Sequence, residues 1–88
     1  MAEHELKVWP EYFDAIEAGE KLFEIRKNDR DYRVGDTLWL REYEPGPDEY
    51  TGYEMRRRVT YMLNGDDPKA FAFGLRTGFV AMSLGTVD

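Results

Sequence analysis

Five short segments of this 88-residue chain alternate apolar and polar residues, and this pattern limits the fold more than any other feature. Alternation with a period of two predicts half-buried β-strands, because successive side chains of a strand point to opposite faces. The predicted strands are HELKVW at 4–9, KLFEIRK at 21–27, TLWLREY at 37–43, YEMRRRVTYML at 53–63 and FVAMSL at 79–84. The expected fold is therefore α+β, mainly β, with about five strands in a small barrel.

The alternation also predicts which side chains share a face. In the strand at 37–43, Leu38 and Leu40 lie opposite Trp39, Arg41 and Tyr43. In the closing strand, Val80, Met82 and Leu84 lie on one face. In the strand at 53–63, one face is predicted to carry Met55, Arg57, Val59, Tyr61 and Leu63.

One helix is predicted near the N-terminus, over PEYFDAIEAG at 10–19. Pro10 suits the first helical position, where its missing N–H costs nothing, and Gly19 favours the helix end. Gly35 in VGD is predicted to take a positive φ in a tight turn. The segments at 44–52 and 64–70 are expected to be loops, and AFAFGL at 70–75 is left open as a strand, a helical turn or a flap.

Composition indicates a single domain over residues 1–88, with 42% hydrophobic residues for a core. No apolar run approaches the length of a membrane span, and a cytoplasmic protein without a membrane association is expected. Without cysteine and with His4 as its one histidine, the chain is predicted to hold neither a metal site nor a cofactor. His4, close to the N-terminus, is expected to be exposed or to cap an element.

The charges are segregated along the chain, although the net charge is −6. Residues 21–33 contain five bases and three acids, whereas residues 42–54 contain five acids and no base. Two interpretations stay open: the charges pair across strands of a small sheet, or the bases line a local cationic cleft on an acidic body.

The segment GEKLFEIR at 19–26 holds the strongest candidate site. Glu24 and Arg26 are two residues apart on a strand and point to the same face, opposite Phe23 and Ile25, and Lys21 lies at the entrance of that strand. Together they can hold a phosphate or a base edge, because guanidinium groups bind such groups bidentately. The alternative is an ion pair that fixes the strand edge. Candidates around this site are Lys7, Arg30 and Trp9, although Trp9 is expected to pack under the helix.

The order of these elements resembles the ASCH domain of the PUA-like superfamily, and most closely a small bacterial and phage branch of it. The resemblance rests on a Gly-x-Lys-x-x-Glu-x-Arg segment after the first helix, here Gly19, Lys21, Glu24 and Arg26, and on the following turn at Gly35 and Asp36. It covers residues 4–43 well and the strand pattern to 84 loosely. The implied fold is a PUA-like barrel with one helix packed near its N-terminus.

The resemblance implies a cleft between helix and barrel that binds RNA or a nucleotide. Some similar proteins are amidohydrolases that deacetylate N4-acetylcytidine with the lysine of this motif, a threonine three residues later and a glutamate further along. Lys21 matches the lysine, but Glu24 stands in the place of the threonine, and no glutamate follows Glu54. Lys21 and Glu24 would be catalytic only if the chain is an enzyme.

Three hypotheses follow from these patterns. The favoured one is an RNA- or nucleotide-binding module that uses Lys7, Lys21, Glu24, Arg26 and Arg30. The first alternative is a small amidohydrolase acting on a modified nucleoside. The second is a protein-interaction domain that meets a basic partner through the acidic segment 42–54. The expected oligomeric state is a monomer or a weak homodimer.

Overall fold

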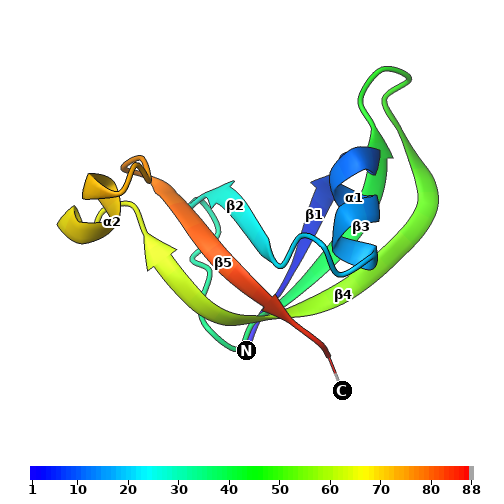
Figure 1. Cartoon of the computed structure of the whole chain (residues 1–88). Coiled ribbons are helices and arrows are strands. Elements are labelled where there is room, and N and C mark those ends of the chain that lie inside the picture. Colours follow the sequence, from blue (N-terminus) through cyan, green and yellow to red (C-terminus); the bar gives the residue numbers. More distant parts are fainter. Residues whose placement is uncertain (88) are drawn as a thin grey trace.

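A computed structural model describes residues 1–87, which form one curled five-stranded sheet and two helices (Figure 1). The elements are β1 (Glu3–Val8), α1 (Pro10–Glu17), β2 (Phe23–Lys27), β3 (Thr37–Glu44), β4 (Glu49–Asn64), α2 (Pro68–Ala72) and β5 (Phe79–Gly85). The strand order is β1-β3-β4-β5-β2; β1 and β3 are parallel and the other neighbours are antiparallel. The sheet is a half-barrel with β1 and β2 as its two edge strands.

The core lies on the concave side of this sheet and follows the predicted alternation. Alternate side chains of β1, β3 and β5 are buried, and in β5 this holds for Val80 and Met82 while Leu84 is partly buried. Phe13 and Ile16 of α1 complete the same cluster, as the helical spacing predicts. The fully enclosed strand residues are Leu6, Val8, Leu38, Leu40, Val59, Val80 and Met82.

Helix α1 ends where the sequence indicates, and this end positions β2. Gly19 has a φ of 77°, a left-handed conformation that glycine adopts without a steric penalty. The N–H groups of Glu20 and Lys21 both donate to the carbonyl of Ala15. These hydrogen bonds fix the backbone just after the helix, and Lys21 lies two residues before β2.

The face prediction for β4 is correct up to Val59 and wrong beyond it. The pairing of β4 with β5 shifts register between Val59 and Tyr61, so one extra residue is inserted at Thr60. Such a β-bulge reverses which of the following side chains face the core. Met62, rather than Tyr61 or Leu63, pairs with buried Met82 and packs against the core, while Tyr61 and Leu63 are exposed.

Two predicted loops contain more regular structure than expected. In the segment 44–52, Glu44 ends β3, β4 begins at Glu49, and only residues 45–48 form the connecting turn. In the segment 64–70, Asp67 caps α2 by accepting the Lys69 backbone N–H, and α2 continues into the segment that was left open. Residues 1–87 thus contain two helices where one was predicted.

His4 is buried, which corrects the prediction of an exposed or capping residue. Its Nε2 lies 2.8 Å from Oδ2 of Asp36, and its ring packs against Tyr32. Burial alone would raise the pKa of the Asp36 carboxyl. The hydrogen bonds from His4 and from the backbone N–H groups of Ala2 and Arg33 outweigh it and hold that pKa below its usual value. This cluster fixes the Gly35–Asp36 turn to the start of β1.

Among residues 1–87, neither helix has the length and apolar character needed to cross a bilayer.

Candidate functional site

Strand β2 directs Glu24 and Arg26 toward the interior of the half-barrel, whereas Phe23, Ile25 and Lys27 are exposed. Glu24 is 5% exposed, whereas Phe23 and Ile25 are 48% and 51% exposed. A hydrophobic pattern alone would favour the reverse orientation. A buried carboxylate needs partners of opposite charge, so the residues around Glu24 determine what this strand can do.

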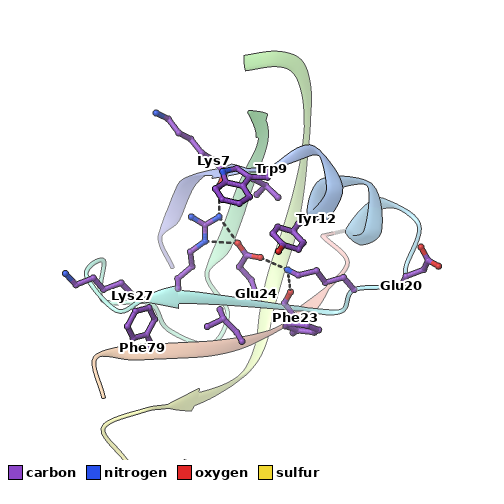
Figure 2. A pocket seen from close by; sticks show the side chains of 12 residues that line it. Lys7, Trp9, Tyr12, Glu20, Phe23, Glu24, Lys27 and Phe79 are labelled. Atoms are coloured by element: carbon purple, nitrogen blue, oxygen red, sulfur yellow. Dashed lines mark hydrogen bonds and ion pairs between the residues drawn. The ribbon is translucent and has the colours of Figure 1, made fainter. Parts of the chain in front are cut away.

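Two cations bind the Glu24 carboxylate from either side (Figure 2). Lys21 Nζ lies 2.8 Å from Oε1, and Arg26 Nε lies 2.7 Å from Oε2. Lys21 Nζ also donates to the carbonyl of Phe23, at 2.8 Å. The predicted ion pair therefore exists, but as a three-residue cluster with one negative and two positive groups.

Arginine side chains connect the two edge strands of the sheet. Arg26 Nη2 donates to the carbonyl of Lys7 at 2.6 Å, and Arg30 Nη1 donates to the carbonyl of Glu5. We call the gap between β1 and β2 that these contacts span the β1–β2 seam. Side chains thus occupy backbone acceptors that an open sheet edge would expose to another strand.

A pocket of about 720 Å³ opens at the free edge of β2. Four of its lining residues are cationic, namely Lys7, Lys21, Arg26 and Lys27, and Glu20 and Glu24 are acidic. Figure 2 shows Trp9 and Tyr12 on the side of β2 that carries Glu24, and Phe23 and Phe79 on the other side. The Trp9 and Tyr12 rings stack with centroids 6.3 Å apart and an interplanar angle of 15°.

The prediction that Trp9 packs under the helix is wrong. The side chain is 55% exposed and forms a wall of the pocket together with Tyr12. The core cluster to which Phe13 and Ile16 of α1 belong contains Leu and Val side chains of β1 and β3, and Trp9 is not part of it.

A second cavity of about 460 Å³ continues along the β1–β2 seam. Its lining residues are Glu5, Lys7, Arg26, Arg30 and Tyr50, so it shares Lys7 and Arg26 with the first. The structure therefore brings together all five predicted site residues: Lys7, Lys21, Glu24 and Arg26 line the first pocket, and Arg30 lines the second.

Two aromatic lining residues, Tyr12 and Phe79, were not predicted as part of this site, whereas Trp9 was a candidate beside it. Tyr12 was expected beside the apolar face of the predicted helix, and Phe79 at the start of the closing strand. Tyr12 follows Trp9 by three positions, the spacing at which neighbours on one turn meet, and this was the available signal. Phe79 reaches the pocket only because β5 pairs with β2, where Phe79 lies opposite Lys27.

The acidic segment 42–54 is less available than its sequence indicates. Glu42 is buried and accepts a hydrogen bond from Thr51 at 2.7 Å. Glu54 lies near Arg41 and Arg56. Exposed acids remain at the end of the β3–β4 hairpin, at Asp48 and Glu49. Within residues 1–87, no group of three or more potential metal ligands comes together.

Comparison with known proteins places this chain in a family. A family model described as a domain of unknown function, DUF3850, matches residues 3–84. The chain belongs to this family. All residues that line the two cavities of this chain lie within the matched range.

A phage protein is similar to this DUF3850 chain. The uncharacterized 12.9 kDa protein in the GpA 3′ region of Escherichia phage P2 is 44% identical over 64 residues. That alignment covers 73% of this chain and 57% of the phage protein, so the chain spans little more than half the length of this relative.

Proposed function

We propose that the pocket at the free edge of β2 binds a nucleotide or a short single strand of RNA. The observation that carries this proposal is the Trp9–Tyr12 wall beside the Lys21–Glu24–Arg26 cluster in one 720 Å³ space. Pockets of a few hundred cubic ångströms with an apolar lining and a few fixed polar groups are typical small-ligand sites. An exposed aromatic wall next to cations suits a flat base that carries a phosphate.

The contacts support a division of roles within the pocket. Aromatic rings stack on unpaired bases, and each such contact contributes about 1–3 kcal/mol. The carboxylate of Glu24 accepts hydrogen bonds from both cations, so its position and theirs are fixed before a ligand arrives. Lys21 and Arg26 have further N–H donors for base edges or phosphate oxygens.

The resemblance to the ASCH domain supports the same proposal. The features that support a PUA-like fold for this DUF3850 chain are the Gly19–Arg26 motif, the helix α1 before it and the curled sheet. The resemblance suggests RNA binding only by analogy between folds. Because a fold does not determine function, the proposal rests on the residues of the pocket.

The contacts of Lys21 favour binding over the amidohydrolase alternative. A nucleophilic or basic lysine needs a free lone pair on its nitrogen. Lys21 Nζ donates to two acceptors, the Glu24 carboxylate and the Phe23 carbonyl, and such a position suits an ammonium group. Incubation of the protein with N4-acetylcytidine tests this alternative, and release of cytidine that Lys21→Ala abolishes would revive it.

The test of the proposed function is an amide NMR titration with a short single-stranded RNA at low salt. We expect shifts confined to the ends of β1 and β2 and to α1. Trp9→Leu should weaken binding about tenfold, because it removes a stacking ring. Tyr53→Leu is the matched control, since Tyr53 is also an exposed ring but does not line the pocket. Equal loss in both variants, or no shifts in a folded protein, would overturn the proposal.

A further inference from the structure

The two cavities adjoin along the β1–β2 seam, and the two residues that line both of them, Lys7 and Arg26, are both cationic. Arg30 adds a third cation on the side away from the aromatic wall. We call Lys7, Arg26 and Arg30 the seam cations. Positive groups thus concentrate at the junction between the cavities, where a linker between two occupants would lie.

The seam cations keep donors free for a ligand. Arg26 uses Nε and Nη2 for Glu24 and the Lys7 carbonyl, and its Nη1 makes no hydrogen bond to residues 1–87. Arg30 uses Nη1 for the Glu5 carbonyl. Lys7 Nζ lies 4.4 Å from the centroid of the Tyr43 ring and has no carboxylate partner in the described chain. A guanidinium has five N–H donors, so both arginines can bind an anion without losing their structural contacts.

Glu5, the carboxylate that lines the second cavity, pairs with Arg41, which lies outside the cavity. Arg41 Nη1 lies 2.7 Å from Oε2 of Glu5, and the same guanidinium stacks 3.8 Å from the centroid of the Tyr50 ring. Glu5 is therefore paired, and Tyr50 is held as a side wall. The charge that remains to act on a ligand in this cavity comes from the seam cations.

We propose that the seam cations bind the phosphodiester that joins the nucleoside in the pocket to its neighbour. This inference rests on the proposed function and narrows its ligand class: the preferred ligand is a single strand of at least two nucleosides, and a free nucleoside fills only half of the site. Guanidinium groups bind phosphate oxygens bidentately, and fixed donors favour such binding.

The experiment compares nucleosides with their dinucleoside monophosphates. Adenosine, cytidine, guanosine and uridine are titrated into the 15N-labelled protein, followed by ApA, CpC, GpG and UpU and by the deoxy forms of these dinucleotides. For any base that binds, the dinucleotide should bind about tenfold more tightly than its nucleoside at low salt. The logarithm of the dinucleotide's binding constant should fall with the logarithm of the salt concentration with a slope of about −0.7. The binding constant of the nucleoside should hardly depend on salt. The deoxy arm separates RNA from DNA as the source of the phosphodiester.

Two substitutions and a control test whether the seam cations cause the higher affinity for the dinucleotide. In Arg30→Gln and in Lys7→Gln, the ratio of dinucleotide to nucleoside affinity should fall from about ten to about three or less. Arg33→Gln is the matched control, because Arg33 is a neighbouring arginine that pairs with Asp31 and lines neither cavity. It should keep the wild-type ratio.

The outcomes separate this inference from the proposed function. If nucleosides bind at Trp9 and Tyr12 and dinucleotides bind no more tightly, the pocket stands and the phosphate role of the seam is overturned. If neither class produces shifts at these residues, the proposed function itself fails, and the inference with it. If a variant unfolds, the salt slopes of the wild-type protein still decide, because a slope near zero for the dinucleotides contradicts the inference.

Discussion

Two carboxylate–arginine pairs in this chain have the same spacing and opposite environments. Glu24 and Arg26 are two residues apart, and so are Asp31 and Arg33. The Glu24 side chain is 6% exposed and contacts a second cation, Lys21, whereas the Asp31 and Arg33 side chains are 81% and 74% exposed. Loss of a buried partner leaves its cations without compensation, while exposed pairs contribute little because water and salt screen them.

Glu24→Gln should therefore lower the free energy of unfolding by about 2 kcal/mol, because the amide can accept from only one of the two cations. Asp31→Asn should change it by less than about 0.5 kcal/mol. Both variants remove one negative charge, and asparagine tolerates the positive φ of residue 31, so the comparison isolates burial. Urea unfolding at pH 7 measures both values. Equal losses would show that Glu24 has no special structural role.

At the scale of elements, the β-bulge at Thr60 decides which residues of β4 belong to the core. The sequence alternates without interruption through Val59, Tyr61 and Leu63, and a regular strand would bury all three. The bulge instead turns Met62 inward and leaves Tyr61 and Leu63 exposed. Long β4 pairs with two neighbours, β3 and β5, and the bulge increases the local twist that lets the sheet curl between them.

A pair of charged substitutions tests this reversal. Met62→Lys should destabilise the protein by about 2–3 kcal/mol, because it introduces a cation beside Met82 and the core. Leu63→Lys should stay within about 0.5 kcal/mol, since that side chain already faces solvent. Thermal unfolding followed by circular dichroism measures both. The opposite ranking would mean that β4 runs without a bulge.

The elements also show how far local patterns predict this fold. Strands β1, β3 and β5 follow from alternation, because alternate side chains of each strand pack on the core. The bulge was not predictable, since it depends on pairing with β5. The sequence also did not predict which face of β2 points to the interior. Glu24 can point inward because Lys21 and Arg26 both donate hydrogen bonds to its carboxylate. The five charged site residues came from the motif, whereas Phe79 needed the tertiary pairing of β5 with β2.

At the scale of the whole molecule, the seam is a cationic line on an acidic body. The net charge is −6, and several cations outside the seam already bind carboxylates, as Arg41 binds Glu5 and Arg56 binds Glu3. At the end of the β3–β4 hairpin, Glu44 and Glu49 face each other across the two strands. On the proposed function, a strand of RNA that extends beyond the seam would therefore meet a surface that repels phosphates, and the favourable field would be local.

The proposed RNA affinity should consequently stop increasing beyond a few nucleotides. Strands of about four and about twelve uridines should bind within about threefold of each other, with the same salt slope, because only phosphates in the seam displace counterions. Glu49→Lys provides the contrast: it places a cation opposite Glu44 and should make the longer strand bind more tightly, with a steeper slope. Fluorescence anisotropy over a salt series measures all four combinations. A slope that grows with length in the wild-type protein would show that RNA follows cationic surface well beyond the seam, and the acidic body would then have no part in limiting the ligand.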